Sequence, residues 1–225
     1  MSTKDNNLIE KFKIALTSTA KVISDDLELN KFSENQSKKE DIIDVNDLTK
    51  PSDFIRLRAE TDSAALKKKF SNNDIYKKNL PSNSSSKSLY NIAEKIRYES
   101  LGGKMLKGIE KNFNINYAQI LSLKRKDLIK NKEDVSITEA FELYMLKNFH
   151  KIELNSTNSK MLSFWEQDFE QSIDKHKKFL EENLEDQDNY SSKFSKILEE
   201  MDVFQNEEDE EKINENQDQD QDNPS

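Results

Sequence analysis

Arginine is scarce in this chain, and its few arginines are the side chains best suited to specific ion pairing. The 35 basic residues include only four arginines, which are Arg56, Arg58, Arg97 and Arg125. A planar guanidinium binds a carboxylate through two parallel hydrogen bonds, which a lysine ammonium cannot do. Asp62 follows Arg58 by one helical turn, and Glu99 lies two residues after Arg97. The four side chains that we expect to share a buried ion-pair network are Arg58, Asp62, Arg97 and Glu99. The alternative is a set of solvated charges worth under ~1 kcal/mol each.

The rest of the chain offers few groups for catalysis. The absence of cysteine excludes disulfides, thiolate zinc sites and cysteine nucleophiles. There are two histidines: His150 is expected at a helix end, where a protonated ring suits the helix dipole, and His176 follows the apolar stripe of Trp165, where packing explains it better than ligation. The sequence contains neither a phosphate-binding Gly-x-x-x-x-Gly-Lys loop nor a Gly-x-Ser-x-Gly elbow. We therefore expect no catalytic, cofactor-binding or metal-binding residue in this chain.

All three glycines, Gly102, Gly103 and Gly108, fall in one segment that otherwise reads as helix. Glycine costs about 0.5–1 kcal/mol relative to alanine inside a helix, so its use here needs a reason. Gly103 continues the apolar stripe of Ile96, and a missing side chain there would let a second helix approach, main chain to main chain, or let the helix bend. The alternative is a helix broken by a turn at Gly102-Gly103.

Helical periodicity predicts the elements that hold these residues. Apolar side chains recur at helical spacing over about 8–23, 51–70, 89–113, 162–180 and 190–204. Pro51 suits the first turn of a helix, and Ser136 with Glu139 has the spacing of a capping box that starts another. Residues 30–50 and 71–88 read as polar loops. No run alternates convincingly with period two, so the fold class is expected to be all-α, a helical bundle.

Composition divides the chain into a nearly neutral body and an acidic tail. Hydrophobic residues make up 33% and charged residues 35%, which suits one domain with tails. The net charge of −9 separates into −8 for residues 205–225 and −1 for the rest. The tail has too few apolar residues to offset its ordering entropy and is expected to be disordered. The predicted divisions are an N-terminal helix and polar loop (1–50), a helical domain (51–204) and the acidic tail (205–225).

Charge and hydropathy also limit where the protein works. A neutral body with an acidic tail argues against nucleic-acid binding, which needs a basic face. No N-terminal signal peptide is visible, and no stretch approaches the ~18 apolar residues of a membrane span. The expectation is a cytoplasmic protein that binds neither nucleic acid nor membrane.

Several of these segments resemble a known family, the CobT subunit of aerobic cobaltochelatase. Arg58-Ala-Glu-Thr-Asp-Ser-Ala-Ala-Leu66 is similar to its Arg-Gly-x-Ala-Asp-x-x-Ala-Leu segment, and Arg97-Tyr-Glu-Ser-Leu-Gly-Gly-Lys-Met-Leu-Lys-Gly108 is similar to its glycine block. Residues 162–170 resemble its Trp-centred helix and residues 185–190 its Asp-Gln segment. The resemblance rests on order and spacing and is strongest over 56–112 and 161–204. Ala59 replaces the family's glycine and Asn73 its histidine.

The resemblance implies a role in cobalamin biosynthesis. The family's complex uses ATP to insert cobalt into a corrin ring, hydrogenobyrinic acid a,c-diamide. A large catalytic subunit holds ring and metal, a hexameric AAA+ ATPase subunit hydrolyses ATP, and the CobT subunit assembles with it. This chain would then be a non-catalytic assembly subunit, with ATP and cobalt used by the complex and no cofactor bound by the chain.

Two further expectations concern the end of the chain. Members of the family continue past an acidic linker into a von Willebrand factor A-type domain with an Asp-x-Ser-x-Ser motif, which this sequence lacks. It is expected to be a naturally split subunit, a fragment or a truncated product. The alternative function is that of a free-standing helical adaptor or chaperone-like protein whose acidic tail binds basic protein surfaces, with steep salt sensitivity.

Overall fold

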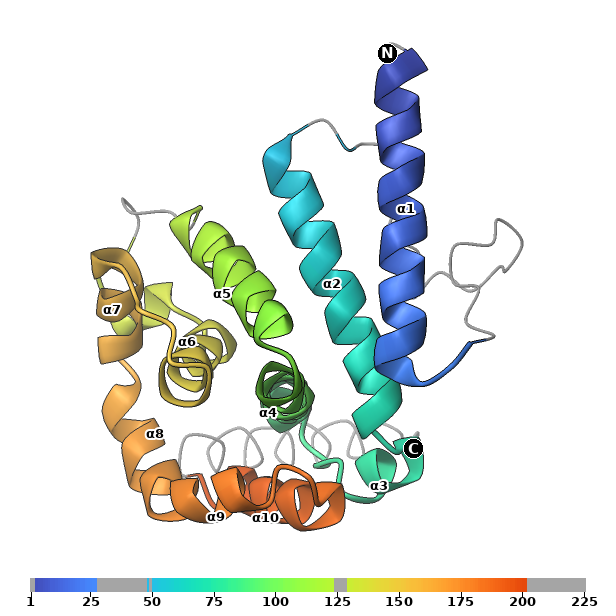
Figure 1. Cartoon of the computed structure of the whole chain (residues 1–225). Coiled ribbons are helices and arrows are strands. Elements are labelled where there is room, and N and C mark those ends of the chain that lie inside the picture. Colours follow the sequence, from blue (N-terminus) through green and yellow to red (C-terminus); the bar gives the residue numbers. More distant parts are fainter. Residues whose placement is uncertain (1–2, 28–47, 49, 124–128, 202–225) are drawn as a thin grey trace, which may run out of the picture.

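The described residues form helices, as periodicity predicts. The structure, a computed structural model, describes residues 3–27, 48, 50–123 and 129–201. Within those ranges it contains α-helices and short 3-10 turns and no strand, which confirms the all-α fold class (Figure 1). The predicted acidic tail and nearly all of the predicted loop at 30–50 lie outside the described residues.

The helices begin and end as follows. They are α1 (Thr3–Ser24), α2 (Pro51–Phe70), α3 (Asn73–Lys78), α4 (Ser84–Met105), α5 (Lys107–Ser122), α6 (Ile137–Phe149), α7 (Ser156–Ser163), α8 (Glu166–Ile173), α9 (Lys177–Glu182) and α10 (Gln187–Glu199). Two 3-10 turns, η2 (Lys132–Asp134) and η3 (Asp174–His176), lie between them. Polar side chains cap several first turns: the Ser136 hydroxyl, for example, accepts a hydrogen bond from the backbone N–H of Glu139, as the capping box predicts.

Several predicted boundaries are wrong, and two of them have local reasons. The Asn- and Ser-rich stretch 71–88 reads as a loop, but Asn72 and Asn83 are N-caps, and α3 and the first turn of α4 follow them directly. The single helix predicted over 162–180 is divided into α7, α8, η3 and α9. The first division falls at Trp165, whose φ of −124° and ψ of −9° leave the helical conformation.

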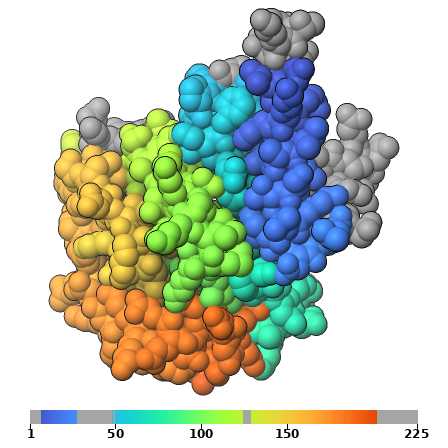
Figure 2. All heavy atoms as spheres, in the orientation of Figure 1, coloured from blue at the N-terminus to red at the C-terminus, as the bar shows by residue number. Residues whose placement is uncertain are grey.

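Helix α4 is the centre of the bundle. It packs against α2, α5, α6 and α10, and Figure 1 views it nearly end-on among them. On the side of α6, α8 and α10 the core is aromatic, with Phe141 in edge contact with both Phe169 and Phe194. In Figure 2, α5 fills the middle of one face, and the α9–α10 segment closes its lower edge. The segment that carries the predicted site residues is therefore surrounded by helices.

Helix α1 is attached to the bundle through α2. The two helices lie side by side (Figure 1). Leu16 of α1 and Leu57 of α2 form a small apolar cluster with Leu48. Ala20 and Ile23, near the end of α1, join the main core. The proposed boundary at residue 50 stays a prediction, but α1 does bury apolar surface against the body.

Candidate functional site

The four side chains predicted to share one network lie in three separate clusters. Arg97 pairs with Glu94 and not with Glu99, while Arg58 and Asp62 pair on another helix. The prediction of a single network is therefore wrong. Helix geometry explains why, because residues two apart point to different sides of a helix, whereas residues three apart share one face.

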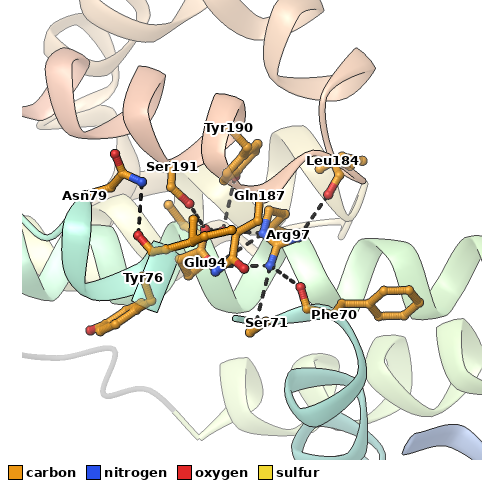
Figure 3. Close-up of polar contacts among 12 residues, drawn as sticks. Phe70, Ser71, Tyr76, Asn79, Glu94, Arg97, Leu184, Gln187, Tyr190 and Ser191 are labelled. Atoms are coloured by element: carbon orange, nitrogen blue, oxygen red, sulfur yellow. Dashed lines mark hydrogen bonds and ion pairs between the residues drawn. The ribbon is translucent and has the colours of Figure 1, made fainter. Parts of the chain in front are cut away.

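Arg97 is fully buried and has a partner at each nitrogen of its guanidinium. Nε lies 3.2 Å from Glu94 Oε1. Nη1 donates to the backbone carbonyl of Leu184 at 3.0 Å, and Nη2 donates to that of Phe70 at 2.7 Å (Figure 3). This one side chain therefore connects the end of α2 and the loop before α10 to α4.

Both oxygens of the Glu94 carboxylate also accept hydrogen bonds from α10. Oε2 accepts a hydrogen bond from Gln187 Nε2 at 3.1 Å, and Oε1 accepts one from the Ser191 hydroxyl at 2.6 Å. Gln187 also accepts the backbone N–H of Asn72 at 2.6 Å, which joins the loop after α2 to α10. We call Glu94, Arg97, Gln187 and Ser191 the Glu94–Arg97 junction (Figure 3). Because its buried charges are fully engaged with partners from other elements, the junction fixes the relative positions of α2, α4 and α10.

Glu99 belongs to a second buried cluster, between α2, α4, α5 and α6. Its carboxylate accepts hydrogen bonds from the Ser63 and Tyr117 hydroxyls, each at 2.6 Å. Burial raises the pKa of Glu99, against the lowering effects of the nearby Lys95 charge and of these two hydrogen bonds. Burial and the adjacent Glu99 together hold the pKa of Tyr117 well above its usual value.

His150 lies in the same cluster, and the prediction that its ring is protonated is wrong. It does cap the end of α6, but its side chain is only 6% exposed and burial lowers its pKa to about 4. Its Nε2 lies 3.9 Å from Glu99 Oε2, beyond hydrogen-bond distance. The ring is therefore neutral at pH 7, and desolvation outweighs the helix dipole.

The third cluster joins α2 to α5. Arg58 Nε lies 3.4 Å from Asp62 Oδ2, as the spacing predicts, but the arginine side chain is 40% exposed. The buried Asp62 also accepts a hydrogen bond from Asn112 Nδ2 at 2.8 Å. Burial raises the pKa of Asp62, while Asn112 and Arg58 oppose that shift. The contact between the helices is thus made by Asn112 rather than by Arg58.

The close contact predicted at Gly103 is found one residue earlier. A Cβ added to Gly102 would lie 2.3 Å from Leu66 Cδ1 on α2, so the Leu66 side chain would have to shift to admit it. A Cβ on Gly103 would meet only Glu110 Cβ at 3.4 Å, and one on Gly108 would meet nothing within 4 Å. The helix runs through both Gly102 and Gly103 and breaks at Leu106, which is extended. The main chain of α4 at Gly102 therefore packs against the Leu66 side chain of α2, and not against the main chain of that helix.

Trp165 and His176 have different surroundings. The Trp165 indole donates to the backbone carbonyl of Val135 at 3.0 Å, and Lys132 Nζ lies 4.0 Å from its ring centroid. Trp165 therefore anchors the segment before α6. His176 lies in η3 and is partly exposed, and its packing on the apolar stripe stays a prediction.

Sequence reasoning missed the partners of Arg97. Glu94 stands three residues before it, which was a usable signal, because side chains at that spacing meet on a helix. Gln187 and Ser191 lie about 90 residues further along the chain and could not be paired with it by spacing. Among the described residues, no group of three or more His, Asp or Glu side chains could hold a metal ion. No helix in the same ranges is long and apolar enough to cross a membrane.

Comparison with known proteins gives one finding. The family model described as "Cobalamin biosynthesis protein CobT" matches residues 6–225. Searches of curated proteins and of solved structures found no match. The matched range contains all three buried clusters and the segments whose order resembles that family. The chain therefore belongs to the CobT family of cobalamin biosynthesis proteins, which take part in the metal chelatase cobaltochelatase.

Proposed function

We propose that this chain is a non-catalytic assembly subunit of an ATP-dependent cobaltochelatase that inserts cobalt into a corrin ring, hydrogenobyrinic acid a,c-diamide. The observation that carries the proposal is the family match over residues 6–225. In this role the AAA+ ATPase subunit hydrolyses ATP, and the large catalytic subunit holds the ring and its substrate cobalt. The chain itself works in the cytoplasm and supplies a binding body.

The chemistry of the clusters supports a binding role. Three ionisable side chains in segments that resemble the family, Asp62, Arg97 and Glu99, are engaged in bonds to other elements of the body. Such bonds make the relative positions of α2, α4 and α10 well defined. A body of that kind suits transmission of a partner's motion, because it moves as a unit rather than deforming.

Co-elution with the ATPase tests the proposal. The full chain and the AAA+ subunit are co-expressed, purified through a tag on the ATPase and passed over a sizing column. The matched variant carries Asn or Gln in place of the acidic residues of 205–225. We expect both forms to co-elute with the ATPase at low salt and at ~0.5 M salt, where exposed charges are screened beyond a few ångströms.

The same experiment separates the rival function. A free-standing adaptor that binds through its acidic tail would lose its partner in the neutralised variant and at high salt. Failure of the unmodified chain to co-elute under either condition would contradict the assembly role.

A further inference from the structure

A groove lined by lysines lies between α2, α3 and α4. Its volume is about 940 Å³. The lining side chains are those of Ala64, Lys67, Lys68, Ser71, Asn73, Tyr76, Asn91, Glu94, Lys95 and Tyr98. We call this feature the lysine groove. It adjoins the Glu94–Arg97 junction through Glu94 and Ser71, and it adjoins the Glu99 cluster through Lys95, whose Nζ lies 5.4 Å from the centre of the Tyr117 ring.

The charge of the lysine groove is positive. Three of its lining residues are lysines, and its one acidic residue, Glu94, is already neutralised by Arg97. Lys67 is exposed on α2, and Lys95 lies across the groove on α4. The side-chain amides of Asn73 and Asn91 add hydrogen-bond donors. Such a surface suits a chain segment that carries several carboxylates.

Carboxylates already bind beside this groove. Asp26, just after α1, pairs with Lys68, and its neighbour Asp25 pairs with Lys69. The lysines at the end of α2 therefore accept acidic side chains from elsewhere in the molecule. Neither aspartate lines the groove itself.

The chain carries an acidic segment that can reach the groove. Residues 205–225 contain nine acidic residues and one lysine. Ser191, which is hydrogen-bonded to Glu94, lies ten residues before Met201, a rise of about 15 Å along a helix. The five residues 202–206 can span up to ~17 Å when extended, so Glu207 and the acids after it are within reach of the groove.

We propose that the acidic segment 205–225 binds within the same molecule in the lysine groove, through Lys67 and Lys95. The inference does not depend on the proposed role in cobaltochelatase, since it concerns only two parts of one chain. An acidic partner would have to displace this segment to use the same lysines.

Paramagnetic labelling of the full chain tests the proposal. Because the chain contains no cysteine, Gln217→Cys gives a single attachment site for a nitroxide without changing the charge of the segment. We expect line broadening concentrated at the backbone amides of Lys67, Asn73, Asn91 and Lys95. The broadening should be lost when Lys67→Glu and Lys95→Gln are introduced together, and at ~0.5 M salt.

A matched control and a mixing experiment make the result decisive. Lys104→Glu with Lys111→Gln makes the same change in net charge at exposed lysines outside the groove, and it should leave the broadening in place. Lys67→Glu alone serves if the double variant fails to fold, and it should reduce the broadening. Equal broadening in the groove and control variants, or broadening spread evenly over the surface, would overturn the proposal. So would broadening that arises only between labelled and unlabelled molecules mixed together.

Discussion

At the scale of single residues, the fold depends on charged and polar side chains that are buried and matched. Arg97 and Glu94 are almost completely removed from solvent; they pair with each other along α4, and their other hydrogen bonds cross to neighbouring elements. A buried pair of this kind is sensitive to loss of one member, because the other is left as an uncompensated charge.

Glu94→Gln tests the junction. The substitution keeps the size of the side chain but removes the charge that faces Arg97, so we expect the free energy of unfolding to fall by about 3–5 kcal/mol. Urea unfolding followed by circular dichroism measures the loss. The control is the exposed Glu170→Gln, which should stay within about 0.5 kcal/mol of the unmodified chain. A loss below about 1 kcal/mol for Glu94→Gln would mean that the junction contributes no more than a surface pair.

Gly102 and Gly108 form a matched pair of tests. Gly102→Ala places a methyl group against Leu66 and should destabilise the protein by about 1–3 kcal/mol, the usual cost of overpacking. The methyl group of Gly108→Ala would contact no other atom, and the free energy of unfolding should rise by up to about 1 kcal/mol. Thermal melting of both variants measures the difference. Equal midpoints would show that the contact with Leu66 can relax freely.

His150 makes stability depend on pH. Its pKa is lowered to about 4 in the folded state from an ordinary value of 6.5, so the unfolded chain binds the proton first. The stability it contributes is complete above pH 6.5 and is lost as pH falls toward 4, at most about 3 kcal/mol. Urea unfolding at pH 7 and pH 4.5 should therefore show a larger loss for the unmodified chain than for His150→Phe. Glu99, whose pKa is shifted in the opposite direction, is present in both proteins. Parallel pH profiles would contradict the buried, neutral ring.

At the scale of elements, the sequence predicts a helix correctly where a single apolar stripe packs against a single neighbouring helix. The second helix was predicted over 51–70 and is found as Pro51–Phe70. Spacing could not predict the breaks at Leu106 and Trp165, because an apolar stripe continues across both of them. The pairing of Arg97 with Glu94 was accessible from helical spacing, whereas its link to α10 depends on tertiary packing. The close contact at Gly102 likewise depends on where Leu66 of another helix lies.

The contact between α2 and α5 can be measured by a double-mutant cycle. Asp62→Ala, Asn112→Ala and the pair together isolate the hydrogen bond that joins the two helices, and we expect a coupling of about 1–3 kcal/mol. The control cycle with Arg58→Ala and Asp62→Ala should give less than about 1 kcal/mol, because Arg58 is largely exposed. Additive losses for Asp62 and Asn112 would exclude a coupled contact.

Helix α1 should open separately from the rest. Leu16 packs with Leu48 and Leu57 in a cluster separate from the main core. Leu16→Ala should therefore lower the free energy that holds α1 against the body by about 2–5 kcal/mol, with little effect on the other helices. Hydrogen exchange should then lose protection in α1 while α4 and α6 keep theirs. Uniform loss across all three helices would mean that α1 unfolds only with the whole body.

At the scale of the whole molecule, the family places the chain among cobalamin biosynthesis proteins and the structure gives its body a defined arrangement of helices. The order of short motifs along the sequence is that of this family. Folding brings those motifs together around α4, where Asp62, Arg97, Gly102 and the Asp-Gln segment each contribute to contacts between helices. The motifs thus specify how the helices of the body are arranged.

Cobalt insertion in a reconstituted mixture tests this role most directly. The large catalytic subunit, the AAA+ ATPase subunit, ATP, cobalt and hydrogenobyrinic acid a,c-diamide are combined with and without the full chain, and the initial rate of insertion is followed by the absorbance of the corrin ring. We predict no insertion without the chain. With the chain present, the rate should rise with the concentration of the chain until that concentration equals the concentration of the ATPase subunit. An equal rate in its absence would contradict the account, and so would insertion by the chain and the large subunit without the ATPase.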